Sequence, residues 1–478
     1  MVFKLFSDDV KTYQIVIIAQ LRQPQIKTLI YQMTKALLYT IATAALLFAS
    51  AGIHSVQAND EKLAFVYELV RHGARAPIIE EPKGWFQVKL GLLTATGMRQ
   101  RNLLGSYNRQ RYVEREGLLD EVYNPSQLYI QSTGVDRTIQ STYSELLGMY
   151  PPTNTQQLKK SLSEGSISDK AMPPMKIRGS VGLEGTLKAT LPLYLDSYVN
   201  VPVYSFLAKN TPDDDIQPGG CTYALTYNSD HWNKVATYAG ISDFIMPILR
   251  EPVGKAFGYT RAEIDALTFV NIYMLSDVLL AENMEGDTPR YNFTSEQWHY
   301  IREAQKIVLL EPISDFAREL WITKQFRKPM QAFHQRVNEI LAQSNNNDTL
   351  RYMLYSAHDV QVANVLHWLQ PVDFEVIDVP YASNFHFELS YNETCLQTET
   401  PNKYQCFSVK VLYNNEPIHL GTCLDANQKA GRHTKTCIYT DFIAHIDSLS
   451  FKGDLAAECE RPWNSEPSPF RKSHQISG

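Results

Sequence analysis

Three short apolar runs, far apart in the chain, each end in polar residues that precede a helix-like segment. They cover residues 63–70, 128–132 and 351–356. Such runs, alternating with helical patterns, are typical of strands that are buried between two layers of helices. We therefore predict an α/β fold with a three-layer core, in which helices cover both faces of a mostly parallel sheet.

Polar side chains stand where these predicted strands end. In parallel sheets, ligands bind beyond the carboxyl ends of the strands. The residues at those ends are Arg71, His72, Arg75, Arg137, His358 and Asp359. The sequence therefore predicts a site with three guanidinium groups, two imidazoles and one carboxylate, drawn from segments almost 290 residues apart.

Three arginines at one point require an anionic ligand, because guanidinium groups stay charged and match phosphate oxygens. A histidine among them is a poor metal ligand, since the surrounding cations repel a metal ion. It can instead act as a nucleophile, and a carboxylic acid nearby can protonate a leaving alkoxide and then activate water. The set therefore has the groups needed for metal-free hydrolysis of a phosphate monoester.

Each of these residues also has a structural explanation. A buried arginine at a strand end often forms an ion pair, and a His-Asp dipeptide is usually a surface feature. Their joint occurrence favours the functional interpretation. The remaining histidines that we considered are expected to be partly buried or surface residues without a role: His231, His299, His334, His367 and His386.

Two motifs connect the chain with a known family. Residues 70–77 (Val-Arg-His-Gly-Ala-Arg-Ala-Pro) match the RHGxRxP signature of the histidine acid phosphatases, the second branch of the histidine phosphatase superfamily. Residues 355–359 (Tyr-Ser-Ala-His-Asp) match the distal His-Asp motif of that family. Residues 93–97, 132–138 and 380–383 also fit, and the likeness spans roughly residues 62–459. The chain most resembles the prostatic and lysosomal type of these enzymes.

The resemblance implies that His72 is the nucleophile that carries the phosphoryl group, and that Asp359 is the proton donor and later the base. The residues implied to hold phosphoryl oxygens are Arg71, Arg75, Arg137 and His358. No metal or other cofactor is implied. Activity is expected at acidic pH, where an aspartate with a reference pKa of roughly 4 can be protonated, and where His358 is expected to be cationic.

The leading prediction is therefore an acid phosphatase that acts on small phosphomonoesters through a phosphohistidine. A phytase or another inositol-phosphate phosphatase is the main alternative, but it needs further cations, whereas Glu80, Glu81, Trp85 and Phe86 follow the signature. A secreted glycoprotein that binds phosphate without turnover is a third alternative. The intact His72 and Asp359 argue against it.

Residues 33–58 have the pattern of a secretory signal peptide. Lys35 precedes an apolar stretch over residues 36–50, and Val56 and Ala58 occupy the −3 and −1 positions of a cleavage site. A membrane anchor is the alternative, but the stretch is short for a span of roughly 20 residues. Residues 1–32 are either a long basic leader region or follow from a start codon placed too far upstream.

The composition of the mature chain fits an extracytoplasmic compartment. Removal of residues 1–58 changes the net charge from −6 to −9, which argues against a nucleic-acid partner. All six cysteines follow residue 58, as expected for an oxidising compartment. We predict secretion or a lysosomal lumen, with no membrane anchor in the mature form. The only predicted partner is a small-molecule phosphomonoester, and the sequence leaves a monomer and a homodimer both open.

Six cysteines allow 15 pairings. The resemblance implies disulfides Cys221–Cys459 and Cys423–Cys437, which leaves Cys395 and Cys406 to pair locally. Three sequons predict glycosylation in a eukaryotic secretory pathway, at Asn292, Asn347 and Asn392.

The predicted organisation has five parts. They are an N-terminal extension with the signal peptide (1–58), the first part of the core (59–150), an inserted and mainly helical cap (151–346), the second part of the core (347–460) and a polar tail (461–478). Helical patterns in the cap cover residues 230–238, 261–279 and 295–310. In the second part of the core we expect strands at 384–390, 407–413 and 418–420, with a tight turn at Asn414-Asn415.

Overall fold

The computed structural model describes residues 61–80, 86–152, 199–206, 214–232, 234, 241–286, 291–344, 347–372, 374–376, 378–431 and 436–464. The predicted signal peptide, Glu81, Trp85 and most of the predicted polar tail lie outside these residues.

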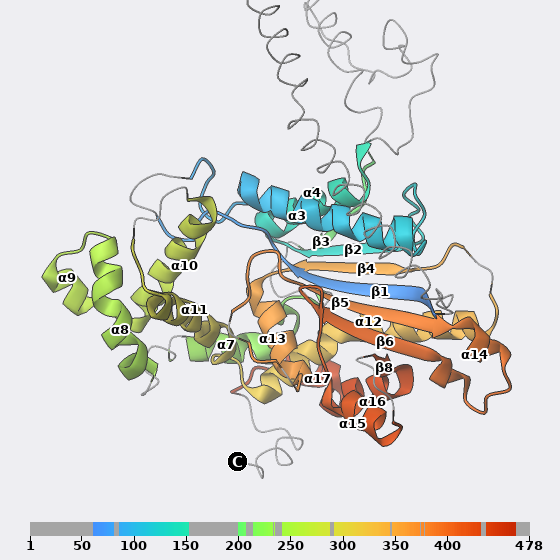
Figure 1. The fold of residues 1–478 in the computed structure, drawn as a ribbon. Helices are drawn as coiled ribbons and strands as arrows, with labels where there is room; N and C mark the ends of the chain where they lie inside the picture. The colour runs from blue at the N-terminus through green and yellow to red at the C-terminus, as the bar shows by residue number, and fades with distance from the viewer. Residues whose placement is uncertain are drawn as a thin grey trace, which may run out of the picture. The chain divides into compact units, whose positions relative to one another are not determined.

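The fold is built on a mixed sheet with the strand order β3-β2-β4-β1-β5-β6-β7, in which β8 also pairs with β6 (Figure 1). The strands are β1 (Glu61–Arg71), β2 (Leu128–Thr133), β3 (Tyr204–Phe206), β4 (Tyr352–Ala357), β5 (Asn384–Asn392), β6 (Phe407–Tyr413), β7 (Glu416–Pro417) and β8 (Cys437–Ile438). Strands β3, β2, β4 and β1 are parallel, while β5 to β8 add antiparallel pairs at one side. The predicted α/β class is confirmed.

Strand β1 is buried on both faces. Phe65, Tyr67 and Leu69 belong to one apolar cluster, which also contains residues of α12 (Asp315–Leu341), α13 (Asp359–Leu369) and α16 (Tyr439–Leu449). Val66 and Val70 point to the opposite face, into a second cluster next to α3 (Ala95–Asn108) and α4 (Asp136–Met149). Figure 1 shows these two helical layers on opposite faces of the sheet. The alternation along β1 therefore produces the three layers.

A further set of helices has an apolar cluster of its own. The cluster is formed mainly by α8 (Ile241–Ala256), α10 (Phe269–Glu285) and α11 (Ser295–Leu310). The short helix α9 (Arg261–Ala266) precedes Leu267, which belongs to the same cluster. In contrast, α7 (Thr222–Trp232) and α12 contribute residues to the cluster of the sheet. The remaining described helices are η1 (Arg109–Arg115), η4 (Pro218–Gly220), α14 (Glu393–Gln397), η6 (Lys403–Cys406), α15 (Gly421–Lys429) and α17 (Leu455–Glu460).

Several predicted elements have other boundaries in the structure. The helix expected at 295–310 is α11. Of the helix expected at 230–238, residues 230–232 belong to α7, and residues 233 and 235–238 lie outside the described residues. The helix expected at 261–279 is two helices. They divide at Thr268, whose side chain accepts a hydrogen bond from the backbone N–H of Asn271 and so caps α10. Asn414-Asn415 forms the expected turn, with positive φ at both residues, but the following strand is β7 and not 418–420.

Three disulfides connect the six cysteines, as the sequence and the resemblance led us to expect: Cys221–Cys459, Cys395–Cys406 and Cys423–Cys437. Two of them close short local loops. Cys221–Cys459 instead joins α7 to α17 across 238 residues of sequence. It therefore ties the C-terminal segment to the beginning of the helical region.

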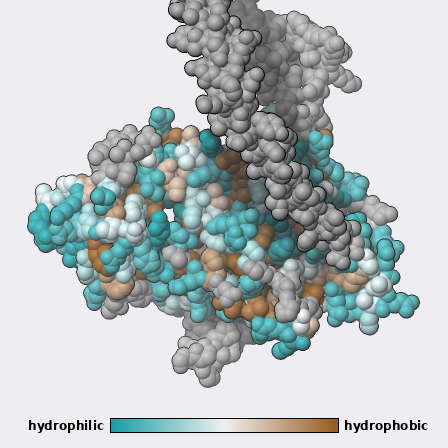
Figure 2. Space-filling view, in the orientation of Figure 1, coloured by the Kyte–Doolittle hydropathy of each residue, from teal (hydrophilic) through white to brown (hydrophobic). Residues whose placement is uncertain are grey.

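Among the residues that the structure describes, no helix is long and apolar enough to cross a membrane. Figure 2 shows a mostly hydrophilic face, on which apolar residues form scattered patches.

Candidate active site

Sheet topology brings the predicted site residues together. β1 pairs in parallel with β4, with Arg71 opposite Ala357, so that His72 and His358 follow neighbouring strands at the same edge. β2 is the other neighbour of β4, and α4, which begins three residues after β2, carries Arg137 in its first turn. This edge is the one that the sequence predicted for the site.

A close approach of two glycines fixes the segment after β1. A Cβ atom at Gly73 would lie 2.3 Å from the backbone oxygen of Gly97, and one at Gly97 would lie 2.0 Å from that of Ala74. The backbone N–H of Gly73 also donates to Ser141 Oγ at 3.0 Å. The signature segment is therefore held between the first turn of α3 and helix α4.

The His72 imidazole is buried, with 1% of its surface exposed. Its Nδ1 lies 2.8 Å from the carbonyl oxygen of Gly73. Because a carbonyl oxygen can only accept, Nδ1 carries the proton and Nε2 keeps its lone pair. Burial and the cations Arg71 and Arg137 lower the pKa of His72 well below its usual range. His72 is therefore a neutral imidazole with a free Nε2 lone pair, as a nucleophile requires.

The three arginines are held in different ways. Arg71 Nη2 lies 2.5 Å from Asp359 Oδ2, and the Arg71 guanidinium lies over the Tyr381 ring at 4.2 Å. Arg75 donates two hydrogen bonds to Asp277, at 3.1 and 2.7 Å. Arg137 donates to His358 and has no carboxylate partner among the described residues. Burial and the nearby Arg75 lower the pKa of Arg137 to about 10.

The three arginines share one feature, which is a buried Nε–H group without a hydrogen-bond partner in the described part of the chain. The Nε–H groups of Arg71, Arg75 and Arg137 are buried and have no hydrogen-bond partner among the described residues. An unpartnered buried N–H is costly, and three of them on cationic groups beside one imidazole form a site suited to an anion with several oxygens. These groups could bind the oxygens of an anion such as phosphate, as the sequence predicts.

His358 differs from the prediction. Its Nδ1 accepts a hydrogen bond from Arg137 Nη2 at 3.1 Å, so its Nε2–H faces Thr133 Oγ1 at 2.9 Å. Burial and Arg137 lower the pKa of His358 to about 3. The expectation that His358 is cationic at mildly acidic pH is thus wrong for the unliganded protein, because three arginines already supply the local positive charge.

This neutral buried histidine predicts a pH-dependent stability. Between about pH 3 and 6.5 the unfolded chain binds a proton at His358 that the folded chain does not, so the free energy of unfolding should rise with pH. One such group contributes at most about 1.4 kcal/mol per pH unit. Urea unfolding between pH 5 and 6.5 should therefore show a smaller slope in His358→Gln. Substitution of the exposed His299 by glutamine is the control and should leave the slope of stability against pH unchanged. An unchanged slope in His358→Gln would contradict the assignment of His358 as a neutral buried histidine.

Asp359 is the first residue of helix α13, and its Oδ1 accepts a hydrogen bond from the backbone N–H of Val360 at 2.9 Å. Burial alone would raise the pKa of Asp359, but Arg71 and Arg75 outweigh it, so this pKa is lower than usual. The carboxyl group also lines a cavity of about 150 Å³. It can thus reach both the arginines and a group that occupies this cavity.

Two residues of the candidate active site were given no role from the sequence. Asp277 of α10 holds both Nη atoms of Arg75, and its Oδ2 also accepts the backbone N–H of Ile78 at 3.0 Å. Tyr381 lies below Arg71, and its ring centroid is 5.8 Å from that of His72. A usable signal existed for Asp277, since it is the sole charged residue between Phe269 and Ala281.

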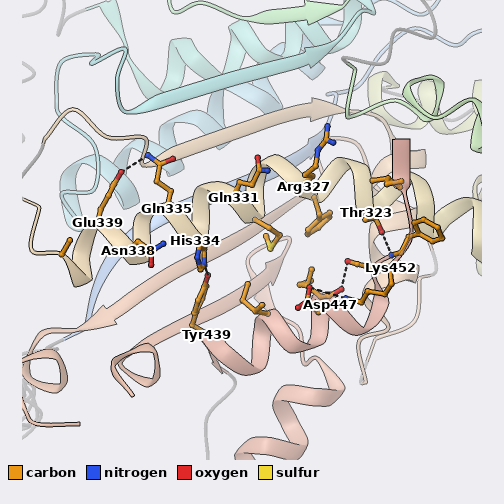
Figure 3. A pocket seen from close by; sticks show the side chains of 18 of the residues that line it. Thr323, Arg327, Gln331, His334, Gln335, Asn338, Glu339, Tyr439, Asp447 and Lys452 are labelled. Atoms are coloured by element: carbon orange, nitrogen blue, oxygen red, sulfur yellow. Dashed lines mark hydrogen bonds and ion pairs between the residues drawn. The ribbon is translucent and has the colours of Figure 1, made fainter. Parts of the chain in front are cut away.

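A larger cavity, of about 900 Å³, lies between α12 and α16 and contains none of these residues. Figure 3 shows side chains of both helices lining it, with His334 close to the Tyr439 hydroxyl. The surface of this cavity is mainly apolar, and its charged side chains do not converge on one point as the three arginines do. The chemistry of the side chains, and not cavity size, favours the residues around His72 as the candidate active site.

Comparisons with known proteins agree with this assignment. Residues 62–179 match the histidine phosphatase superfamily (branch 2). The chain is 34% identical over 423 residues to lysosomal acid phosphatase from Bos taurus, covering 83% of this chain and 80% of that protein. It is 26% identical to prostatic acid phosphatase from the same species, covering 70% and 75%. The phytase from Citrobacter braakii has a similar fold, with a TM-score of 0.53 at 13% identity, over 84% of this chain and 99% of that chain.

Fold and site thus define a phosphohydrolase of the histidine phosphatase type. The chain belongs to branch 2 of the histidine phosphatase superfamily, as a member of the histidine acid phosphatases. It is accordingly a phosphoric monoester hydrolase.

Proposed function

We propose that the enzyme hydrolyses phosphate monoesters through a covalent phosphohistidine at His72, without a metal. The observation that carries this proposal is the hydrogen bond from His72 Nδ1–H to Gly73, which leaves a free lone pair on Nε2 of an imidazole that senses the charges of Arg71, Arg75 and Arg137. In the first step the Nε2–phosphorus bond forms while the bond from phosphorus to the ester oxygen breaks. The guanidinium groups neutralise the charge on the non-bridging oxygens.

Asp359 supplies the proton in this scheme. The leaving alkoxide takes the proton of the Asp359 carboxyl group, and the resulting carboxylate then removes a proton from the attacking water. Water forms the new phosphorus–oxygen bond as the bond to His72 breaks. The low pKa of Asp359 in the free enzyme fits this role once a substrate is bound, because a phosphate monoanion offsets the charges of Arg71 and Arg75, raises that pKa and can supply the proton.

The cavity beside Asp359, where the leaving group of the substrate would lie, favours a compact substrate. The 150 Å³ cavity beside Asp359 has apolar walls formed by Leu280, Met284 and Leu309. Its cations already face carboxylates, since Arg302 lies 3.3 Å from Asp378 and Arg71 pairs with Asp359. A second phosphate group on the leaving group would find no unpaired cation among these lining residues. This supports a simple monoester over an inositol polyphosphate.

A substrate panel tests the proposal. Protein that starts at Asn59 should hydrolyse an aryl phosphate, phosphotyrosine and lysophosphatidate at acidic pH in the presence of EDTA. Phytate should be a poorer substrate by at least about tenfold in kcat/KM, roughly the effect of 1.4 kcal/mol. A requirement for a divalent metal would reject the mechanism, whereas a preference for phytate would promote the alternative.

Secretion or a lysosomal lumen remains the proposed location. It is supported by the similarity to lysosomal acid phosphatases and by three disulfides. Among the sequons, Asn292 and Asn347 are exposed, whereas Asn392 Oδ1 accepts the backbone N–H of Cys395 at 2.7 Å. Glycosylation is therefore proposed first for Asn292 and Asn347.

The division into a core (59–150 and 347–460) and a helical cap (151–346) is kept as a proposal. The separate apolar cluster of α8 to α11 supports a distinct helical unit. The residues that α7 and α12 contribute to the cluster of the sheet indicate that the unit is smaller than the predicted range.

A further inference from the structure

A group of buried charged side chains lies behind the active site and has no part in the proposed chemistry. Arg101 of α3 is completely buried. Its Nη1 donates to the backbone oxygen of Arg71 at 2.8 Å, and its Nη2 contacts Glu145 of α4. Arg101 therefore links the last residue of β1, directly before His72, to the helix that carries Arg137.

A second carboxyl group lies beside Glu145. The Asn108 amide donates to Glu145 Oε1 at 3.0 Å and to Glu68 Oε2 at 3.1 Å, so that it bridges the two. Tyr352 also donates to Glu68, and His386 Nε2 lies 3.4 Å from Glu68 Oε1. All of these side chains are buried. The cluster thus joins β1, β4 and β5 to α3 and α4.

The pKa values of the two carboxyl groups shift in opposite directions. Burial raises the pKa of Glu145 well above its usual range, and the adjacent Glu68 adds to this effect while Arg101 opposes it. Burial would also raise the pKa of Glu68, but His386 and Arg101 outweigh it and lower that pKa. The Arg101 guanidinium contacts both Glu145 and the backbone oxygen of Arg71, so it cannot move without losing these contacts.

The first requirement for an in-line attack is a fixed nucleophile, and a displacement of about 1 Å can cost on the order of 100-fold in rate. The backbone of Arg71 and His72 carries one cation and the imidazole of the site. Its position is defined by hydrogen bonds on two sides: Arg71 N–H donates to Ser383 O at 2.8 Å, and Arg71 O accepts from Arg101.

We propose that Arg101 is a positioning residue for phosphoryl transfer, and that Glu145 acts with it as the acceptor that holds its guanidinium group. Together they fix the backbone that carries Arg71 and His72 into the phosphate site. This inference rests on the proposed function of His72, and neither residue touches the substrate.

The test compares the buried Arg101 with the partly buried Arg111. Arg101→Lys shortens the side chain and removes the planar fork, so it cannot hold Arg71 O and Glu145 together. We expect kcat for an aryl phosphate to fall about 10- to 100-fold, with KM changing less than about threefold. Arg111→Lys is the matched control, because Arg111 of η1 also pairs with a buried carboxylate, Glu388 at 2.6 Å, but does not contact β1 residue 71. It should lose stability while its kcat stays within about twofold.

Two substitutions of Glu145 keep the proposal testable if Arg101→Lys does not fold. Glu145→Gln retains an oxygen acceptor without a charge and should keep kcat within about threefold of the unaltered enzyme. Glu145→Leu has a similar size but no acceptor and should lower kcat as Arg101→Lys does.

The proposal is overturned if Arg101→Lys, or Glu145→Leu, retains kcat while losing as much stability as Arg111→Lys, since the cluster would then be structural only. It is also overturned if Glu145→Gln is as slow as Glu145→Leu, because the oxygen acceptor at this position would then not be what holds Arg101. The failure of the proposed function itself looks different, because in that case the unaltered enzyme would hydrolyse none of the monoesters.

Discussion

His72→Ala is expected to reduce kcat for an aryl phosphate by about 10⁵-fold or more, the order found when the nucleophile of a covalent mechanism is removed. The reason is structural, because the described site has one neutral imidazole whose free nitrogen lies among the three arginines. KM should change far less, since Arg71, Arg75 and Arg137 still bind the phosphate group. Steady-state assays at pH 5 with nitrophenyl phosphate measure both quantities.

The covalent intermediate gives a second readout for the same substitution. Rapid quenching in alkali, in which a phosphorus–nitrogen bond survives, should trap labelled phosphate on His72 and none in His72→Ala. His445→Gln is the matched control, because His445 is also buried but bonds to Leu369 O and Thr422 Oγ1, away from the site. Labelled phosphate on another residue, or turnover in His72→Ala, would refute the assignment.

Asp359→Asn should lower kcat by about 10²- to 10⁴-fold, the range of general acid–base catalysis. The loss should be largest for alkyl phosphates, whose leaving alkoxide needs a proton, and smaller in the first step for nitrophenyl phosphate. The second step loses its base in either case. With nitrophenyl phosphate, the variant should therefore release a burst of nitrophenol and then accumulate phosphoenzyme, which stopped-flow absorbance would detect.

The pH dependence of kcat/KM follows from the same carboxyl group. Because Asp359 has a lowered pKa, its carboxyl group is ionised in the free enzyme at mildly acidic pH, so the catalytic proton has to arrive with the substrate. A phosphate monoester carries that proton below its second pKa of about 6. For alkyl phosphates, kcat/KM should consequently fall as pH rises above about 6, and Asp359→Asn should lack this decline. The same decline in an otherwise active Asp359→Asn would contradict Asp359 as the acid.

The site could be predicted because its residues follow strands. His72, Arg137 and His358 lie far apart in sequence, but apolar runs directly before them identify strands, and the ends of parallel strands share an edge. The RHGxRxP and His-Asp motifs then indicated a role for each residue. The same reasoning predicted the fold class, because the three apolar runs form the strands β1, β2 and β4 in the structure.

The remaining features depend on contacts that a local pattern does not encode. Asp277 reaches Arg75 across 202 positions because α10 lies against the signature segment. His358 is neutral because of the cations around it, which appear only after the fold is formed. His386, expected to have no role, lies next to Glu68 because β5 pairs with β1. The break between α9 and α10 depends on the Thr268 cap, which an apolar pattern conceals.

The pairing of β1 with strands that are synthesised much later also affects how the protein folds during translation. The neighbours of β1 in the sheet are β4 and β5, whose residues begin at Tyr352 and Asn384. At a ribosomal rate of 5–20 residues per second, about 15 to 60 s separate the synthesis of β1 from that of its first partner. During this interval a nearly continuous apolar strand stays unpaired on the nascent chain. Production of this enzyme should therefore depend strongly on chaperones that shield its N-terminal region until translation is almost complete.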